Sequence, residues 1–413
     1  MKILECTIIA ILTAFPGISG LAQNQYVTIS GKITDSESGD PLPFASIGIA
    51  NTSVGTISNN DGEFDFHFPT NLSENALIIR MLGYEELSIS LSSYGTDHKV
   101  INLDKTSLYL DEVVIVDSLY GGDILRIALS RIEENYPMKE YSMLGFYRDL
   151  KKVNGEYISL LEAAIEIYDK DYSEPRNPLK LRERVGLKEV RKSVNYEFAY
   201  NRYFDQYNLL EELLLENNIK YRSFTSDQVF YDNLRRDSIT NIGKSTVYKL
   251  TLVGDLGYEL ILFIDTQNYG IHKLIYKYGD GTHPIEEIKR SGKRVERIMK
   301  TSKSIEFNQF DGKYYLKYLR VNTNFEWIDL KSGEMEATTE LFQELLINKI
   351  EIISPNWIST GEKMKRYGLQ YQDMPYNKEF WDNYNVIKDT PLDLQIVKDL
   401  QKYGNLNSQF QNN

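Results

Sequence analysis

The segment from Gly31 to Phe66 constrains the fold of this chain more than any other part of it. Apolar side chains alternate with polar ones there in three short runs, before Asp35, around Ile47 and around Phe64. A period of two places successive side chains on opposite faces of a strand, so each run predicts a short β-strand with one buried face. Several short strands at this spacing are typical of a β-sandwich.

Turn-forming residues separate these runs. The DSESGD segment at 35–40 combines side chains that close local hydrogen bonds with Gly39, which accepts a positive φ. Pro41 and Pro43 lack a backbone N–H donor, so we expect this part of the chain at a sheet edge or at the start of a strand. The NNDG segment at 59–62 supplies the residue types that adopt left-handed turn conformations.

Three motifs follow one another in this segment: G-x-I-x-D from Gly31, PLPFASI from Pro41 and VGTISNNDGEF from Val54. Together they closely resemble the carboxypeptidase-regulatory-like domain, a transthyretin-like sandwich common at the N-termini of envelope proteins in Bacteroidetes-type bacteria. The resemblance extends from Tyr26 to Val116 through LIIRMLGY and LDEVVIV. It implies a packing module whose motif residues are structural and not catalytic: Gly31, Pro43, Ala45, Gly55, Asp61, Gly62, Phe64, Gly83 and Tyr84.

The first 22 residues have the pattern of a secretory signal peptide. Lys2 precedes a mostly apolar run from Ile3 to Phe15, and Gly20 and Ala22 provide small residues before a cleavage site. A membrane-spanning helix needs about 20 apolar residues, and this run is shorter. The one cysteine, Cys6, lies in the same segment, so we expect a mature chain without disulfides or a cysteine nucleophile.

Charge and composition restrict the partners. Acidic residues outnumber basic ones by 59 to 47, for a formal net charge of −12. This excess disfavours a nucleic-acid partner, because phosphate backbones are bound by clustered Lys and Arg. We interpret the basic cluster at 289–303 as a charged hairpin surface rather than a site for anionic lipid or peptidoglycan. The 30 tyrosines suit half-exposed strands and contact surfaces.

The pattern changes after the glycines at 121–122. Apolar residues at helical spacing predict a helix that begins with Asp123 as its cap and ends near Tyr136. Asn154 and Gly155, between extended runs at 141–152 and 156–168, are the strongest short hairpin signal. We expect a loop at 169–180. The leucine-rich segment at 203–217 predicts a helix, whose acidic face we interpret as solvated surface rather than a cation site.

From 245 to 353, extended segments alternate with turn residues, which predicts an antiparallel meander. The expected strands are 247–253, 258–265, 271–278, 295–307, 314–323 and 335–352. The segment YELILFIDTQNYGIHKLIY at 258–276 is similar to paired strands of lipoprotein-carrier half-barrels, which cup acyl chains in a curved sheet. The segment at 124–172 resembles one that follows the sandwich in uncharacterised Bacteroidetes envelope proteins. Residues 356–413 read as mostly irregular, with a short helix near 392–403.

Catalytic motifs are incomplete in this sequence. A zinc carboxypeptidase needs His-x-x-Glu and a later histidine. The histidines are His67, His98, His272 and His283, and only the pair formed by His283 and Glu286 has this spacing, with no histidine after it. Neither a Gly-x-Ser-x-Gly nucleophile motif nor a phosphate-binding Gly-x-x-x-x-Gly-Lys-Ser/Thr loop is present. We therefore expect no catalytic residue, no metal and no cofactor.

These observations predict a mainly β protein: a signal peptide (1–22), a transthyretin-like or Ig-like β-sandwich (23–116), an α+β domain dominated by an antiparallel sheet (117–355) and a polar extension (356–413). The favoured function is that of a non-catalytic, exported envelope protein, periplasmic or outer-membrane-associated. Its sandwich would be an interaction module, and its sheet domain would bind an envelope protein or a hydrophobic or polymeric ligand. Two alternatives stay open. One is a lipid or lipoprotein carrier, which requires an apolar pocket on the inner face of the 247–353 strands. The other is a metallocarboxypeptidase-related enzyme, disfavoured by its incomplete ligand set.

Overall fold

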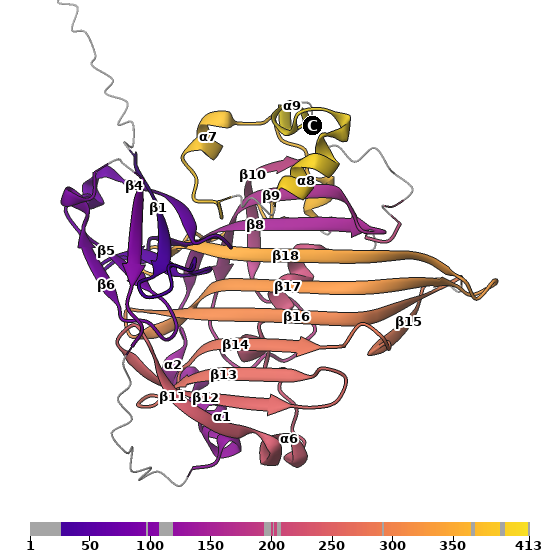
Figure 1. The fold of residues 1–413 in the computed structure, drawn as a ribbon, viewed down its shortest axis with the longest axis horizontal. Helices are drawn as coiled ribbons and strands as arrows, with labels where there is room; N and C mark the ends of the chain where they lie inside the picture. The colour runs from indigo at the N-terminus through magenta and orange to yellow at the C-terminus, as the bar shows by residue number, and fades with distance from the viewer. Residues whose placement is uncertain are drawn as a thin grey trace, which may run out of the picture.

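The computed structural model describes residues 26–95, 98–106, 119–193, 200, 202–204, 208–290, 293–364, 368–388 and 393–411. The predicted signal peptide and the LDEVVIV segment lie outside the described residues. The predicted fold class is confirmed: the chain is mainly β, with an N-terminal sandwich followed by a large antiparallel sheet. In Figure 1 the sandwich, in indigo, lies at one end of the long strands of that sheet.

The sandwich consists of a three-stranded sheet, β4-β1-β7, and a four-stranded sheet, β3-β2-β5-β6, in the described part of the chain. Neighbouring strands are antiparallel except for β1 and β7, which are parallel. The strands are β1 (Tyr26–Asp35), β2 (Ser46–Ile49), β3 (Gly55–Ile57), β4 (Glu63–Pro69), β5 (Ala76–Arg80), β6 (Leu87–Ser90) and β7 (Lys99–Leu103), with one-turn 3-10 helices η1 (Thr70–Leu72) and η2 (Leu91–Ser93).

The alternation of β4 decides which of its faces is buried. Phe64, Phe66 and Phe68 are each at most 1% exposed, while the residues between them are only half-buried. The three rings pack with isoleucines of β1 and β2 in the core of the sandwich. Burying one side chain of this size contributes about 1.5–3 kcal/mol, so these rings are a main source of the stability of the sandwich.

Two short helices follow the sandwich instead of the single predicted one. α1 (Gly121–Ser130) and α2 (Ile132–Asn135) are separated at Arg131. Asp123 is not the cap, because it lies within the first turn of α1, where its carboxylate accepts the backbone N–H of Tyr120 at 3.4 Å. Glycine is needed at position 121, because a Cβ there would overlap the backbone carbonyl of Leu234.

The rest of the chain forms one antiparallel sheet, with eleven strands among the described residues. Its order is β10-β9-β8-β18-β17-β16-β14-β13-β12-β11, and β15 pairs with β16. The strands are β8 (Tyr141–Val153), β9 (Glu156–Asp169), β10 (Arg184–Lys192), β11 (Arg235–Ile242), β12 (Ser245–Val253), β13 (Glu259–Asp265), β14 (Ile271–Tyr278), β15 (Glu286–Arg290), β16 (Arg294–Phe310), β17 (Lys313–Asp329) and β18 (Met335–Glu351). The predicted hairpin between β8 and β9 is confirmed, with φ of 50° at Asn154 and 85° at Gly155.

Different segments cover the two faces of the large sheet. On one face lie α1, α4 (Leu209–Leu215), α5 (Asn218–Tyr221) and α6 (Gln228–Asn233), whose apolar side chains enter the largest core. The other face carries the sandwich and the C-terminal α7 (Lys378–Asp382), α8 (Asp393–Leu400) and α9 (Leu406–Gln411), drawn in yellow in Figure 1. Trp381 packs there against Phe146 and Leu346. Leu345 and Ile347 point to the helical side, so β18 has two buried faces.

Three strands and much of the C-terminal segment differ from the sequence prediction. β10 and β11, the edges of the sheet, were not predicted, and β11 is half-exposed and mostly polar. β15 was absent from the expected strands, but its pairing with β16 agrees with the charged hairpin interpreted at 289–303. The predicted helix at 203–217 is limited to Leu209–Leu215. The segment 356–413 is less irregular than expected, since it contains α7, α8 and α9; the predicted helix near 392–403 corresponds to α8 and η4 (Gln401–Tyr403).

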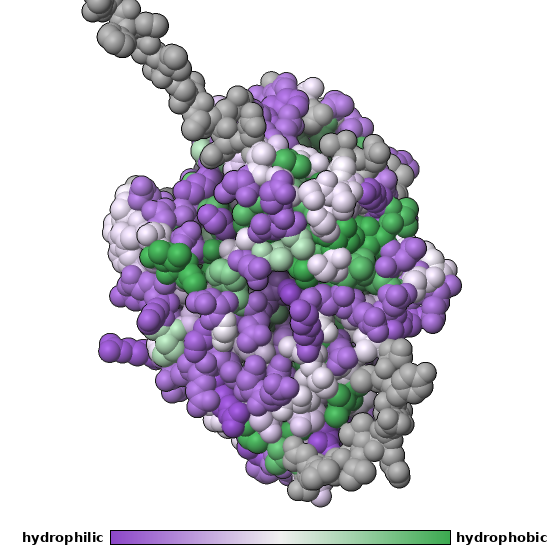
Figure 2. Space-filling view, turned by 90° about the vertical axis from the view of Figure 1, so that its left-hand side faces the viewer, coloured by the Kyte–Doolittle hydropathy of each residue, from purple (hydrophilic) through white to green (hydrophobic). Residues whose placement is uncertain are grey.

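The sandwich is held to the sheet at widely separated strands. The Ser53 hydroxyl donates to the carbonyl of Ile350 in β18 at 2.7 Å and accepts the N–H of the same residue at 3.0 Å. The N–H of Gly83 donates to the carbonyl of Asn241 in β11 at 2.9 Å. Seen from the sandwich side, the surface is mostly hydrophilic, with hydrophobic residues in separate patches (Figure 2).

Candidate ligand-binding groove

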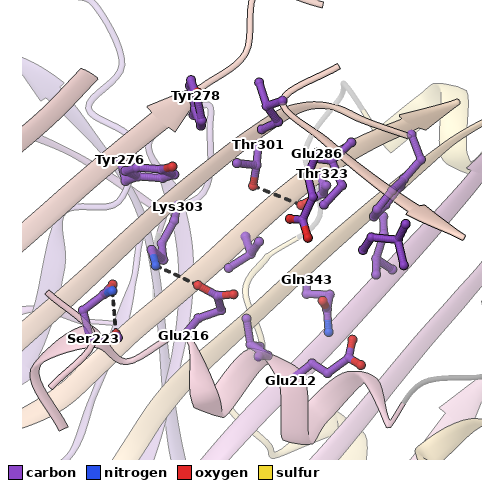
Figure 3. A pocket seen from close by; sticks show the side chains of 18 of the residues that line it. Glu212, Glu216, Ser223, Tyr276, Tyr278, Glu286, Thr301, Lys303, Thr323 and Gln343 are labelled. Carbon is purple, nitrogen blue, oxygen red and sulfur yellow. Dashed lines mark hydrogen bonds and ion pairs between the residues drawn. The ribbon is translucent and has the colours of Figure 1, made fainter. Parts of the chain in front are cut away.

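A groove of about 650 Å³ lies between the helices α4–α6 and the strands that they cover. Strands β13, β14 and β16–β18 form its floor, and β15 borders it across from α4 (Figure 3). Its volume falls within the 300–1,000 Å³ typical of pockets that hold one small molecule. The apolar side chains of the floor are Leu260, Leu274, Ile298, Val321, Phe325 and Leu341.

Three tyrosines form an aromatic wall at one end of the groove. The ring of Tyr258 lies edge-on to those of Tyr276 and Tyr278, with both centroid separations at 5.6 Å. Desolvation raises the pKa of Tyr276 to about 12. The phenol of Tyr276 therefore stays neutral at physiological pH, and the three rings present apolar surface to the groove.

Polar side chains cross the floor in pairs, as Figure 3 shows. The Lys303 ammonium on β16 lies 2.7 Å from the Glu216 carboxylate at the end of α4. The hydroxyls of Thr301 and Thr323 are 3.1 Å apart. These groups already have partners. Each can bind the polar end of a ligand only by giving up its present hydrogen bond or by using a donor or acceptor site that is not yet occupied.

Glu212 differs from these paired groups. Its carboxylate projects from α4 toward the groove, and no lysine or arginine in the described ranges forms an ion pair with it (Figure 3). Desolvation raises the pKa of Glu212 to about 7, against the opposing charge of Arg290 and with further help from neighbouring glutamates. The Glu212 side chain is still exposed to solvent at the groove, so a carboxyl group whose pKa is raised toward neutrality lies beside the apolar floor.

Glu286 lies across the groove from Glu212, on β15 (Figure 3). The remaining charged residues of the lining are paired, Arg290 with Glu296 at 2.5 Å and Lys303 with Glu216. The groove therefore combines an apolar floor with two acidic groups on opposite walls. This arrangement can hold an apolar chain and disfavours an anionic end group.

The histidines are not brought together. His272 is buried in the core, with its Nε2 3.2 Å from the Tyr314 hydroxyl and 3.5 Å from an oxygen of Asp265. His283 lies exposed in the connection between β14 and β15, 2.8 Å from the hydroxyl of Thr282. Within the described ranges, no group of three or more His, Cys, Asp and Glu side chains is placed to hold a metal ion.

The motif residues predicted from the sequence lie in the sandwich, and none of them lines the groove. Ala45 and Phe64 are 0% exposed, and the Tyr84 hydroxyl donates to Asp35 at 2.7 Å. The others are Gly31 in β1, Pro43 before β2, Gly55 in β3, Asp61 and Gly62 in the turn before β4, and Gly83 between β5 and β6. The structural roles of these positions stay predictions.

Sequence reasoning did not identify the groove. The acidic face of α4, interpreted as solvated surface, contributes Glu212 and Glu216 to the lining. Only the half-barrel likeness at 258–276, which contains Tyr258, Leu260 and Tyr276, pointed to this face. The partner of Glu216 is 87 residues away in the chain, and no local pattern indicates such a pair.

Residues 29–115 match the family of the CarboxypepD_reg-like domain. This confirms the domain prediction for the sandwich and leaves the larger part of the chain outside the family match. No curated protein matches the chain.

Solved structures offer distant similarities only. A DUF1329 family protein from Desulfovibrio piger is 8% identical, with a TM-score of 0.22, and covers 57% of this chain and 93% of its own. Lipovitellin, in a structure of its lipid–protein interactions, is 12% identical at a TM-score of 0.24; the match covers 62% of this chain and 29% of lipovitellin. The complex of MucA and MucB from Pseudomonas aeruginosa is 12% identical, with a TM-score of 0.21, and the match covers 55% of this chain and 93% of the matched chain. At such scores these likenesses establish no function.

Among the helices that the structure describes, none combines the length and the apolar composition needed to cross a membrane.

Proposed function

We propose that this chain is a non-catalytic binding protein that holds the apolar part of one amphipathic molecule in the groove between α4–α6 and the large sheet. The observation that carries the proposal is the groove itself, on the face where a lipid carrier requires an apolar pocket. Five strands contribute aliphatic and aromatic side chains to its floor, beside threonines, a glutamine and the ion-paired groups.

The apolar floor provides enough driving force for specific binding. Each methylene removed from water contributes about 0.8 kcal/mol, so a chain of about twelve methylenes gains roughly 10 kcal/mol before the cost of association. That cost is at least about 4 kcal/mol, so at most about 6 kcal/mol remains, and the dissociation constant is no smaller than roughly 40 μM. A single acyl or alkyl chain is therefore a sufficient ligand.

The charges of the groove select the polar end of that ligand. Glu212 and Glu286 face each other across the floor, and the two cations of the lining are already paired. An anionic head group would be repelled by these two carboxylates, which form no ion pair among the described residues. We therefore propose a ligand whose polar end is neutral or cationic.

The cellular setting of the proposal rests on the N-terminal part of the chain. We propose that the protein is exported and acts in the bacterial envelope, on the basis of the signal-peptide pattern at 1–22 and the CarboxypepD_reg-like sandwich. The sandwich then serves as an interaction module, while the sheet domain binds the ligand.

Fluorescence of N-phenyl-1-naphthylamine, a neutral apolar probe, tests the groove. We expect enhanced emission on titration of the protein, with micromolar affinity. Val321→Trp fills the groove from its floor and should weaken binding at least fivefold. Asn322→Trp, one residue along on the other face of β17, should leave the affinity within twofold. Absence of enhancement, or equal effects of the two variants, contradicts the proposal.

Competition distinguishes the polar ends. Dodecylamine and dodecanoate carry the same apolar chain with opposite charges. We expect dodecylamine to displace the probe at a lower concentration than dodecanoate at pH 8, where Glu212 is ionised. Stronger displacement by dodecanoate would rule out the proposed role of Glu212 and Glu286 without affecting the proposal that the groove binds apolar chains.

A further inference from the structure

A second cleft, of about 1170 Å³, lies between the sandwich and the large sheet. The sandwich contributes β2, β3 and their connecting loop, and the sheet contributes the β16–β17 turn and the end of β18. Asn383 to Asn385, after α7, complete the lining. This cleft shares no lining residue with the groove, so it is a separate place for a ligand.

Two neighbouring strands carry a β-bulge at this cleft. In β17, Leu316 pairs with Phe307 and Tyr318 with Glu306, which leaves Lys317 as the extra residue. In β18, the pairing with β8 skips Asn348 in the same way. A bulge redirects the side chain of its extra residue, and bulges are frequent beside functional sites. Here both bulges place a polar side chain in the lining of the cleft.

Lys317 is an incompletely paired cation. It is 6% exposed, and its ammonium donates to the carbonyl of Ile347 at 3.1 Å. No carboxylate in the described part of the chain lies within ion-pair distance of it. Desolvation lowers the pKa of Lys317 to about 7, opposed in part by Glu306. Burying a charge without a counter-ion is costly, so the position favours an anionic partner.

Asn348 offers a matching acceptor. It is 5% exposed, and its Nδ2 donates to the carbonyl of Asn385 at 2.8 Å. Its Oδ1 is buried without a hydrogen-bond partner. Lys317 and Asn348 both line the cleft, and the Lys317 ammonium bonds to the carbonyl of Ile347, directly before Asn348, so one ligand in the cleft can be offered both the ammonium and this amide oxygen. A hydroxyl or N–H group on the same ligand would satisfy it.

The other charges of the cleft are compensated or exposed. Arg80 is paired with Glu86 at 2.6 Å, and Lys349 lies 3.6 Å from Glu351. Asp311 lies exposed in the β16–β17 turn, where solvent screens it. One uncompensated buried positive charge matches a singly charged carboxylate better than a doubly charged phosphate.

We propose that the cleft between the sandwich and the sheet binds a hydroxylated monocarboxylic acid, whose carboxylate pairs with Lys317. A hydroxyl group of the acid donates to the Oδ1 of Asn348. Six asparagines line it, namely Asn51, Asn71, Asn308, Asn348, Asn383 and Asn385, and amide groups both donate to and accept from hydroxyls. Uronic acids combine one carboxylate with several hydroxyl groups and therefore belong to this class.

Isothermal titration of the purified chain with glucuronate tests the proposal, with glucose and inorganic phosphate as comparisons. We expect glucuronate to bind and glucose, which lacks the carboxylate, to bind at least tenfold more weakly. Lys317→Met should weaken glucuronate binding at least tenfold. Lys349→Met, at a paired lysine of the same cleft, should change it by less than twofold. Tighter binding of phosphate than of glucuronate would overturn the assignment to a monocarboxylic acid.

A measurement on the unsubstituted chain covers the case in which Lys317→Met fails to fold. At pH 8 most of the Lys317 amine is neutral, so a carboxylate that pairs with it draws a proton from solution. Titrations in buffers of different ionisation enthalpy should therefore show uptake of a fraction of a proton per glucuronate. Absence of binding, or binding without proton uptake at pH 8, overturns the proposal.

Discussion

The side-chain amide of Asn385 forms a closed pair of hydrogen bonds with the backbone of His67. Its Oδ1 accepts the N–H of His67 at 2.8 Å, and its Nδ2 donates to the carbonyl of the same residue at 2.8 Å. His67 lies in β4, an outer strand of the three-stranded sheet, where backbone groups have no neighbouring strand to pair with. The C-terminal segment thus fastens the sandwich to the sheet domain.

We predict that Asn385→Ala loosens this attachment. The substitution removes two hydrogen bonds and leaves backbone groups of β4 without a protein partner, which should cost about 1–3 kcal/mol of unfolding free energy. Hydrogen exchange should accelerate at the amide of His67. Asn383→Ala is the matched control, because the side chain of Asn383 bonds only within the local turn, to the carbonyl of Glu379. Equal exchange at His67 in both variants contradicts the role of Asn385.

A buried ionic network under the C-terminal segment makes a second prediction. The Arg148 guanidinium lies 2.6 Å from Glu162 and 3.4 Å from Glu344, and all three side chains are less than a tenth exposed. Arg148→Met leaves buried carboxylates short of a partner, which should lower the unfolding free energy by about 3–5 kcal/mol. Urea unfolding measures this. Lys378→Met, which breaks an exposed pair with Asp382, should hardly change the midpoint.

The elements that were predicted correctly are those whose structure is determined by residues next to one another in the sequence. The alternation of Phe64, Phe66 and Phe68 follows from one buried face of β4, and the turn at Asn154 follows from two residues that accept positive φ. β10 and β11 lack such a signal because they are edge strands with mixed exposure. The break at Arg131 also has no local signal.

The two candidate binding sites were beyond local reasoning for a different reason. Glu216 and Lys303 meet across 87 residues, and Lys317 becomes a cleft residue only because β17 bulges there and the sandwich packs beside it. Pair registers and bulges are set by the whole sheet. A single sequence identifies these residues but does not show which residues from distant parts of the chain lie beside them.

Two glycines of the sandwich allow the effect of backbone strain to be distinguished from the effect of steric overlap. Gly62 has a φ of 74° and Gly83 a φ of 80°, so alanine is strained at both positions. A Cβ at Gly83 meets nothing, whereas a Cβ at Gly62 would overlap the carbonyl oxygen of Ile33. We predict that Gly83→Ala costs about 1 kcal/mol and Gly62→Ala about 2–4 kcal/mol in unfolding free energy. Equal losses would mean that the turn before β4 relaxes freely.

The buried amine of Lys317 predicts an unusual dependence of stability on pH. Its pKa is about 7 in the folded chain, against 10.5 for an ordinary lysine. Between these values the unfolded chain binds a proton that the folded chain does not, so the unfolding free energy contributed by this group rises with pH from 7 to 10.5. The slope is at most about 1.4 kcal/mol per pH unit. Below pH 7 the full cost of the buried charge remains.

Lys317→Met isolates this contribution. As the pH rises from 7 to 10, the unfolding free energy of the unsubstituted chain should increase relative to that of the variant, because the variant has no amine to deprotonate. Urea unfolding at four pH values is sufficient. A constant difference over this range would show that the lysine keeps an ordinary pKa in the folded chain, against the burial described for it.

The raised pKa of Glu212 predicts that the affinity of the groove for an apolar ligand falls as the pH rises. Its pKa of about 7 means that the carboxyl gains a proton as the pH falls from 8 to 6. The neutral form is less hydrated, so an apolar ligand displaces less tightly held water and binds more strongly. We expect the affinity for N-phenyl-1-naphthylamine to increase severalfold from pH 8 to pH 6. The neutral probe itself does not change its charge over this range.

Glu212→Gln should remove this dependence and bind at pH 8 as the unsubstituted chain does at pH 6, because the amide imitates the protonated acid. Glu287→Gln is the matched control, since Glu287 lies on β15 outside the lining and is paired with Arg297 at 2.6 Å. It should keep the full dependence. If Glu212→Gln also keeps it, another group titrates in the groove, and the carboxyl of Glu212 does not control the polarity that the ligand meets.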